Sequence, residues 1–312
     1  MHSSDAKTAK KESLLKTIGQ NSLGVLGSLI LLINTLITTI LIFILAIIKI
    51  IVIIKPIRAI ISKLINFVCE NWFSVNNFAI NILYDIKFDI SGSMNLQKND
   101  WYVLLSNHQS WIDCMVLLRV FNRKIPIPKF FSKQEMFWLP IVGLVWWALD
   151  FPRMKRYSKE KLAKNPKLKG KDLEVTKKAI KKFHHIPVTI GNFAEGTRFT
   201  MQKKQKANSP YNNLLQPKAG GLALVLKLMQ GKMNTILDVT IIYPEGMADM
   251  WNFLCGKLKN VKVIVNQITV TDDLIGDYTN DPKYRSYIQS WLNEIFLKKD
   301  ELITNGKLEM ML

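Results

Sequence analysis

His108 and Asp113 are two residues whose types and spacing could carry acid–base chemistry. They stand in the segment Ser106-Asn107-His108-Gln109-Ser110-Trp111-Ile112-Asp113. Five positions on a regular helix separate two side chains by about 140°, so we expect His108 in a turn and Asp113 in the first turns of a following helix. A carboxylate on one imidazole nitrogen fixes the tautomer and leaves the other nitrogen free to accept a proton. The pair predicts a general base for an alcohol nucleophile, although this spacing also arises often by chance.

A second group of polar residues suits phosphate. Glu195, Gly196, Thr197 and Arg198 follow an apolar segment that ends at Phe193. The glycine permits a tight turn, the threonine offers a hydroxyl, and the arginine offers a planar fork that matches phosphate. Arg153 follows another apolar run and supplies a second guanidinium.

The elements that must position these residues are predicted as alternating strands and helices. Trp101–Leu105 is a short apolar run that predicts a buried strand directly before the His108 segment. Further strands are expected at Ile86–Ile90, Ile186–Ile190, Ile236–Tyr243 and Val261–Val270, and helices at Trp111–Phe121, Ala219–Met229 and Tyr284–Leu297. This alternation predicts an α/β fold, with a mostly parallel or mixed sheet covered by helices on both faces.

The N-terminal part of the chain is strongly apolar. Leu23–Ile48 contains no charged residue, and its length exceeds the roughly 30 Å of a bilayer core. A secretory signal would have an apolar region of only about 7 to 15 residues. We therefore expect a membrane-embedded helical anchor. Its topology stays open, because lysines flank both sides and the polar cluster Asn34, Thr35, Thr38 and Thr39 would permit a shallow hairpin.

Residues 55–85 show helical spacing of apolar side chains with charged residues between them. This pattern indicates an amphipathic helix in the membrane interface, with Trp72 and Phe73 as anchors, or alternatively a core-facing helix of the next domain. We thus divide the chain into a basic tail (1–22), a transmembrane or hairpin segment (23–54), the amphipathic region (55–85) and a catalytic domain (86–312).

The charge balance is strongly basic: 43 lysines and arginines against 24 acidic residues give a net charge of +19. Lys155–Lys182 alone holds twelve basic and three acidic residues. Only one aromatic residue is interleaved with these lysines, which argues against nucleic acid. Beside an apolar anchor, the segment is better matched to anionic lipid headgroups. Three scattered cysteines, without a paired motif, indicate a reducing compartment and no structural zinc.

Together these motifs resemble the glycerolipid acyltransferase family, which includes lysophosphatidate acyltransferases. Asn107-His108 through Asp113 matches the N-H-x-x-x-x-D signature, and Arg153 matches the arginine of the second block. Phe193–Arg198 matches F-P-E-G-T-R, and Tyr243-Pro244 matches the fourth block. The chain departs from the family pattern at Ala194, Phe199 and the Phe-Pro-Arg of the second block. These blocks serve phosphate in the family, so the acceptor headgroup is left open.

The resemblance implies roles for individual residues. His108 would act as the base and Asp113 would orient it, while Arg198, with Glu195, Gly196, Thr197 and Arg153, would hold the acceptor phosphate. Asn107, Lys218 and Pro244 would support the site. Lys218, before Gly220 and Gly221, resembles a phosphate or pantetheine contact, but an ordinary helix start explains it equally well. Ser110 and Cys114 are disfavoured as nucleophiles, because Ser110 is too near His108 and no second histidine accompanies Cys114.

The expected reaction transfers a fatty acyl group from acyl-CoA or acyl-carrier protein to a lysophospholipid hydroxyl, with lysophosphatidate as the leading acceptor. The alternatives are an acceptor with a larger headgroup, or a non-catalytic membrane adaptor that binds anionic lipid. No metal or cofactor and no nucleic acid partner is expected. The resemblance also implies the bacterial inner membrane, with the catalytic domain on the cytoplasmic side.

Overall fold

The computed structural model describes residues 2–130, 132–133, 138, 140–149, 151, 153–154, 177, 180, 183, 186–246 and 249–309. Most of the lysine-rich segment Lys155–Lys182 lies outside these residues, so its expected contact with lipid is not addressed by the structure.

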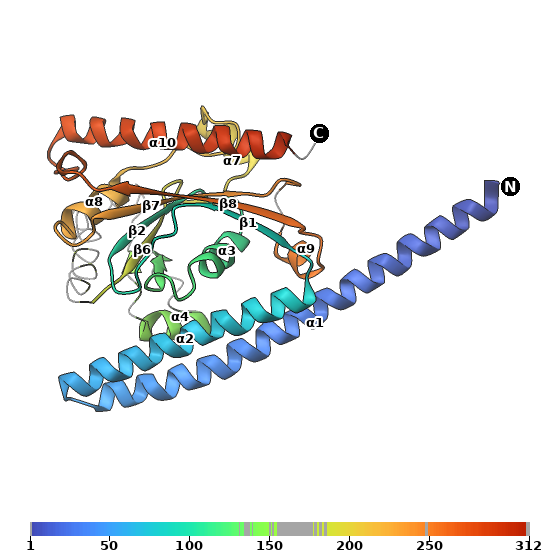
Figure 1. Ribbon diagram of the computed structural model, residues 1–312, viewed down its shortest axis with the longest axis horizontal. Helices are drawn as coiled ribbons and strands as arrows, with labels where there is room; N and C mark the ends of the chain where they lie inside the picture. Colours follow the sequence, from blue (N-terminus) through green and yellow to red (C-terminus); the bar gives the residue numbers. More distant parts are fainter. Residues whose placement is uncertain are drawn as a thin grey trace, which may run out of the picture.

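A six-stranded mixed sheet forms the centre of the molecule (Figure 1). Its strands are β1 (Lys87–Gly92), β2 (Tyr102–Ser106), β3 (Pro128–Phe130), β6 (Thr189–Phe193), β7 (Thr235–Ile242) and β8 (Asn260–Thr269), in the order β1-β8-β7-β2-β6-β3. Strands β7 and β8 run antiparallel, and the other neighbouring pairs of this sheet run parallel. The predicted α/β class with a mixed sheet is confirmed. A separate two-stranded sheet joins β4 (Ser132–Lys133) to β5 (Arg153–Met154).

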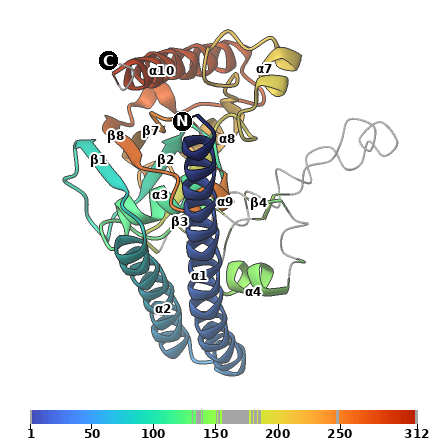
Figure 2. The same cartoon turned by 90° about the vertical axis from the view of Figure 1, so that its right-hand side faces the viewer.

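Helices cover both faces of the main sheet (Figures 1 and 2). On one face lie α8 (Gly220–Leu228) and α10 (Pro282–Leu308), and on the other lie α3 (Ile112–Phe121) and α9 (Met250–Leu254). The short α7 (Met201–Ala207) and the 3-10 turn η4 (Asp272–Leu274) complete the domain.

Strand β2 shows why the sequence folds in this way. All five of its residues are buried; Val103 and Leu105 contribute to the core beneath α8 and α10, and Leu104 contributes to the core beneath α3. Side chains alternate between faces along a strand, so only a continuous apolar run can fill two cores at once. This places the residues after Ser106, including His108, at the carboxyl edge of the sheet.

The N-terminal quarter of the chain forms a helical hairpin. Helix α1 (His2–Ile51) runs without a break through the polar cluster at residues 34–39, and α2 (Lys55–Leu83) returns antiparallel to it after three residues (Figure 1). The alternative of a hairpin within Leu23–Ile48 is therefore wrong: the turn lies at residues 52–54. The polar cluster instead faces α2, because Asn34 Nδ2 donates to Asn76 Oδ1 at 2.7 Å and Trp72 Nε1 donates to Thr35 Oγ1 at 3.2 Å.

Helix α2 has three faces. One packs against α1 with buried apolar residues such as Ile61 and Ile65. The second is polar and is held by the sheet domain through Lys98–Glu70, Arg119–Asn81 and Asn122–Ser74 contacts. The third exposes large apolar side chains at helical spacing: Ile57, Ile60, Leu64, Phe67, Val75, Phe78 and Ile82. The helix thus packs on its neighbours and also presents an apolar outer face, while the expected anchor Trp72 is turned inward.

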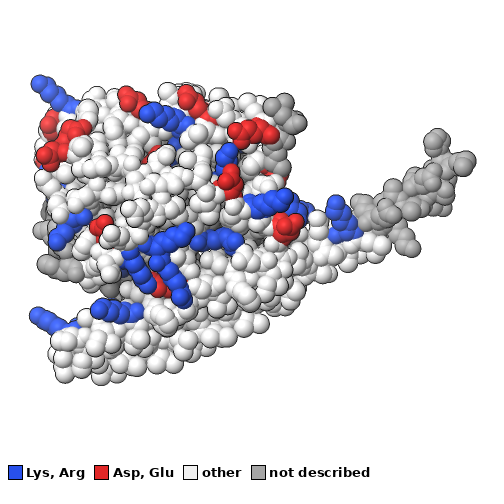
Figure 3. All heavy atoms as spheres, in the orientation of Figure 1, with Lys and Arg blue, Asp and Glu red and all other residues white. Residues whose placement is uncertain are grey.

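Helix α1 also exposes apolar side chains over most of its length. Figure 3 shows a surface nearly free of charged side chains over α1 and α2, with lysines and arginines gathered between it and the sheet domain. Among the described residues, one helix, over Leu15–Ile51, is long and apolar enough to cross a membrane, by its length and composition. Close contact at Gly24 seats α1 on the domain, since a Cβ there would lie 2.8 Å from Cys255 Sγ. Helix α4 (Pro140–Ala148) packs beside α1.

Candidate active site

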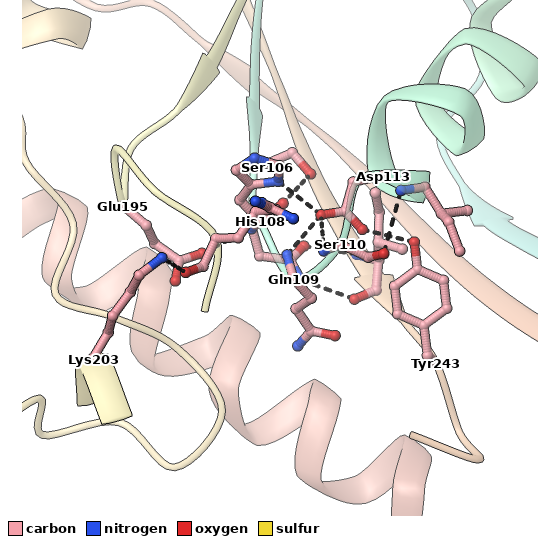
Figure 4. Close-up of polar contacts among 12 residues, drawn as sticks. Ser106, His108, Gln109, Ser110, Asp113, Glu195, Lys203 and Tyr243 are labelled. Carbon is pink, nitrogen blue, oxygen red and sulfur yellow. Dashed lines mark hydrogen bonds and ion pairs between the residues drawn. The ribbon is translucent and has the colours of Figure 1, made fainter. Parts of the chain in front are cut away.

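His108 lies in the turn between β2 and α3, and Asp113 lies in the first turn of α3 (Figure 4). His108 Nδ1 and Asp113 Oδ2 are 2.9 Å apart. The expected geometry, with the carboxylate reaching back to the imidazole, is confirmed. A carboxylate can only accept, so Nδ1 carries the proton and Nε2 of the neutral ring is left as an acceptor. The His108 side chain is 16% exposed and that of Asp113 is fully buried.

Backbone amides of the turn also bind the Asp113 carboxylate. Asp113 Oδ2 accepts from Gln109 N at 2.6 Å and from Ser110 N at 2.8 Å. The chain between the two catalytic candidates therefore wraps around the carboxylate. These bonds fix the side chain that in turn fixes the imidazole, so the pair is oriented before any substrate arrives.

Tyr243 is a further hydrogen-bond partner of the Asp113 carboxylate. Its hydroxyl donates to Asp113 Oδ1 at 2.7 Å, and both residues are fully buried. Burial, and then the nearby Asp113 charge, raise the pKa of Tyr243 well above 10, so the residue acts as a neutral donor. Its role was not predicted, although it stands immediately before Pro244 in the fourth motif block. Pro244 itself lies in the turn after β7, half-buried.

Asn107 joins β7 to residues 107–111, the turn between β2 and α3 that carries His108 and is called the catalytic turn. Its side-chain amide donates to the Ile241 carbonyl at 2.9 Å, and its side-chain oxygen accepts from the Ile241 amide at 2.8 Å. This two-point contact satisfies an otherwise unpaired stretch of buried backbone. The supporting position expected for Asn107 is thus structural: it holds the loop that carries His108.

Glu195 holds the backbone of His108. Its Oε1 accepts from His108 N and its Oε2 accepts from Leu215 N, both at 2.8 Å. Glu195 is 2% exposed, and burial raises its pKa to about 8. Both oxygens are occupied by backbone donors, so the expectation that Glu195 contacts the acceptor phosphate needs correction. Its side chain positions the catalytic turn, which the motif alone could not show.

The other residues of this motif form an open turn. Gly196 has φ of +70°, a left-handed conformation that glycine adopts without steric cost. Thr197 is exposed, and the Arg198 guanidinium lies 4.4 Å from the centroid of the Trp111 ring. The aromatic face orients the guanidinium near the entrance to the catalytic turn.

Lys203 is an additional cation at this turn that we did not predict. Its Nζ donates to Thr197 Oγ1 at 2.7 Å and to the Arg198 carbonyl at 2.9 Å (Figure 4). The sequence offers three lysines within α7, Lys203, Lys204 and Lys206. Thr200 caps the helix by accepting from Lys203 N, so Lys203 lies in the first turn of α7 and its side chain reaches Thr197.

Two expected site residues stay less defined. Arg153 pairs with Ser132 in the small sheet β4–β5, and its side chain lies outside the described part of the chain. Lys218 is exposed, and its backbone amide donates to the Ala194 carbonyl at 2.9 Å. Neither position tests the expected contact with phosphate.

The two disfavoured nucleophiles have structural surroundings. Cys114 is a free thiol whose pKa is raised by burial to about 12, so it stays protonated and is a weak nucleophile. Ser110 Oγ accepts from Ile112 N at 3.3 Å, at the start of α3. Both observations agree with the predicted non-nucleophilic roles. Within the described residues, no group of three or more His, Cys, Asp or Glu could hold a metal ion.

An apolar cavity of about 390 Å³ opens beside His108. The His108 ring stacks on Phe193 with centroids 4.0 Å apart, and Phe193 stacks on Phe130 at 5.0 Å. Both phenylalanines line the cavity, together with Trp111 and residues from four helices: Thr35, Thr38, Thr39 and Ile42 of α1; Cys69, Trp72 and Phe73 of α2; Cys114 and Leu118 of α3; Val145 and Trp146 of α4. The hairpin thus forms part of the wall of an apolar cavity, and His108 lies against that wall through its contact with Phe193. The volume is typical of ligand pockets.

Comparison with known proteins gives the class of this fold and site. A family model described as Acyltransferase matches residues 87–247, more than half of the chain. The chain belongs to the acyltransferase family. The matched residues include the catalytic turn, the Glu195–Arg198 turn and Tyr243, and they end before α10.

Within that family, the chain is similar to 1-acyl-sn-glycerol-3-phosphate acyltransferases. It is 22% identical over 258 residues to the protein named "Probable 1-acyl-sn-glycerol-3-phosphate acyltransferase 5" of Arabidopsis thaliana, covering 78% of this chain and 63% of that protein. It is 22% identical over 213 residues to the gamma protein of Mus musculus, covering 64% of this chain and 52% of that protein. The chain therefore spans less than two thirds of the length of these relatives.

A solved structure was also matched. It is the crystal structure of the 1-acyl-sn-glycerophosphate (LPA) acyltransferase PlsC from Thermotoga maritima, 17% identical, with a TM-score of 0.48. The match covers 93% of this chain and 98% of that one.

Proposed function

We propose that this protein is an O-acyltransferase that moves a fatty acyl group from acyl-CoA or acyl-carrier protein to the free hydroxyl of lysophosphatidate, forming phosphatidate. The observation that carries the proposal is an oriented His108–Asp113 pair whose imidazole stacks on Phe193, a residue of the wall of an apolar cavity. A general base supports the chemistry, and the cavity supports a long apolar substrate. The names of the relatives support the acceptor.

In the proposed reaction, Nε2 of His108 takes the proton of the acceptor hydroxyl as its oxygen attacks the thioester carbonyl carbon. Asp113 holds Nδ1–H and stabilises the imidazolium that forms. The tetrahedral intermediate then collapses, the carbon–sulfur bond breaks, and the imidazolium returns the proton to the leaving thiolate. The products are an ester and a free thiol, and no acyl-enzyme is required. Proton transfer rests on His108 alone, and no cofactor is invoked beyond the acyl thioester as co-substrate.

The cations beside the catalytic turn suit the acceptor's phosphate. Arg198 offers a guanidinium fixed by Trp111, and Lys203 adds a positive charge at the same turn. Arg153 is retained as an assisting residue on the strength of its motif. An acceptor with a larger headgroup would keep a phosphate at the same distance from its hydroxyl and is the competing substrate. A non-catalytic adaptor is disfavoured, because it would have no use for an oriented base.

We further propose that the α1–α2 hairpin lies in a membrane. The exposed apolar faces of both helices support this, as do the cations that border them (Figure 3). The polar contacts of Asn34 and Trp72 satisfy groups that would otherwise face lipid. Free cysteines agree with a catalytic domain on the cytoplasmic side. We propose the bacterial inner membrane as the location on the sequence resemblance alone.

The decisive experiment is an assay of the purified full chain in mixed lipid vesicles. Lysophosphatidate and lysophospholipids with larger headgroups are compared as acceptors, with acyl-CoA and acyl-carrier protein as donors. We expect phosphatidate to form with release of one thiol for each ester. Equal rates with all acceptors would contradict lysophosphatidate as the preferred substrate. An absence of ester with every pair of substrates would overturn the proposed activity.

A further inference from the structure

Lys299 of α10 is buried beneath the sheet, at 1% exposure. Its Nζ donates to the Val239 carbonyl at 2.7 Å and lies 2.5 Å from Asp238 Oδ1. Burying an ammonium costs several kcal/mol of desolvation, and an apolar residue of similar volume would often be as stable or more stable there. A fully buried lysine in a helix outside the matched family region therefore calls for a specific role.

The contacts of Lys299 are made directly below the catalytic turn. Val239 is in register with Ser106, and Ser106 with Phe193. His108 follows Ser106 by two residues, and Glu195 follows Phe193 by two residues. Farther along β7, Ile241 binds the Asn107 side chain, and Tyr243 beyond the strand binds Asp113. The lysine thus holds the part of β7 from which the catalytic turn is supported.

A second link between Lys299 and the site is electrostatic. Glu195 uses both oxygens to accept backbone hydrogen bonds, from His108 and from Leu215, and protonation would make one of these oxygens a weaker acceptor. Burial raises the pKa of Glu195 most, the two backbone hydrogen bonds lower it, and the charges of Asp113 and Lys299 add smaller effects that raise and lower it, respectively. The charged groups that act on Lys299 itself are Asp238 and Glu195.

We propose that Lys299 is a positioning residue of the active site, whose buried ammonium braces the end of β7 and favours the ionised form of Glu195, which holds the His108 backbone. The inference rests on the proposed acyl transfer for its catalytic readout. It makes α10 part of the active-site machinery, although no described residue of this helix lines the apolar cavity beside His108.

The test compares Lys299→Met with the double variant Asp238→Asn/Lys299→Met, and uses the exposed neighbour Lys298→Met as the matched control. The double variant removes both members of the ion pair, so it avoids an unpaired buried carboxylate. Rates are measured from pH 6 to 10 in the vesicle assay. We expect both Lys299 variants to move the acidic limb of the turnover rate up by about one pH unit, which is about a tenfold loss on that limb. The Michaelis constants and the rate at the alkaline end should change little.

Several results would overturn the inference. If the double variant regains the wild-type acidic limb, then Lys299 serves only as the counterion of Asp238. The same conclusion follows if both variants keep that limb. The pH dependence of the melting temperature provides a readout without activity, with Glu195→Gln as the reference for a group that no longer titrates. If the wild type transfers no acyl group, the proposed function fails, and the melting curves still decide whether Lys299 controls the ionisation of Glu195.

Discussion

The Tyr243 hydroxyl donates a 2.7 Å hydrogen bond to Asp113 Oδ1, the carboxylate oxygen that His108 does not use. The two residues are 130 positions apart. The bond crosses from the end of β7 to the first turn of α3 and closes the buried side of the catalytic pair. The carboxylate is thus held from both sides, and His108 is left with one defined ring orientation.

Replacing Tyr243 by phenylalanine should lower turnover by about tenfold, because a hydrogen bond to a charged group is worth roughly 1.5–3 kcal/mol. The ring keeps its packing, so the fold should persist. Steady-state rates and the melting temperature of Tyr243→Phe are the measurements. Unchanged turnover would show that Asp113 is sufficiently held by the turn amides alone.

His108→Ala should reduce turnover by about 10² to 10⁴, the usual effect of losing a general base. The His108 side chain is partly exposed, so protein yield and melting temperature should remain close to those of the wild type. Assays under saturating donor and acceptor measure the change. Activity above one tenth of the wild-type level would remove His108 from its assigned role.

Activity should rise as the pH increases through about 8, because ionised Glu195 completes its two backbone hydrogen bonds. Stability should respond in the opposite direction. The pKa of Glu195 rises on folding from 4.5 to about 8; the stability this group contributes is full below pH 4.5 and is lost as the pH rises toward about 8.

In Glu195→Gln the side-chain amide cannot titrate. Its NH₂ group would face a backbone N–H, and two donors cannot form a hydrogen bond with each other. The variant should therefore be slower at all pH values and should lack the rise near pH 8. Rate profiles and melting temperatures recorded from pH 5 to 10 test both signs. A variant that retains the rise would assign it to another group.

Arg198→Lys should raise the Michaelis constant of the acceptor by about tenfold and leave that of the donor nearly unchanged, because lysine keeps the charge but loses the bidentate fork. The exposed Lys206 of α7 provides a matched control as Lys206→Gln. Initial rates with each substrate varied in turn separate the two constants. An effect confined to the donor would place the thioester, rather than the acceptor, at Arg198.

Membrane binding should weaken when the outer face of α2 is made polar. Phe67 and Phe78 are 55% and 66% exposed, and the double variant Phe67→Ser/Phe78→Ser removes much apolar area from this face. Leu297→Ser on α10, 53% exposed in the native chain, is the control. Co-sedimentation with anionic and zwitterionic vesicles is measured at low and high salt; salt should release only the electrostatic part. Equal binding of all variants would assign the attachment to α1 or to the cationic segments.

Much of the catalytic turn could be predicted from sequence, because its determinants are local. The apolar run Trp101–Leu105 predicts a buried strand, and the spacing from His108 to Asp113 then fits a strand–turn–helix junction. The turn at Gly196 likewise follows from its residue type. Several strands and helices were also predicted within a few residues, whereas β3 was missed because its sequence is short and rich in proline.

Tertiary structure decided which distant groups support that turn. Tyr243 on Asp113, Glu195 on the His108 backbone and Lys299 beneath β7 depend on strand order and on the docking of α10, and no spacing along the chain encodes them. The cavity also depends on tertiary structure, because its wall combines residues of α1, α2, α3, β3 and α4. From sequence, the polar cluster around Asn34 fitted either a continuous helix or a hairpin. The structure shows a continuous helix, in which Asn34 forms a hydrogen bond with Asn76 of α2. Local residue types determine a turn; burial and partners that shift a pKa or orient a carboxylate arise only when segments far apart in sequence are packed together.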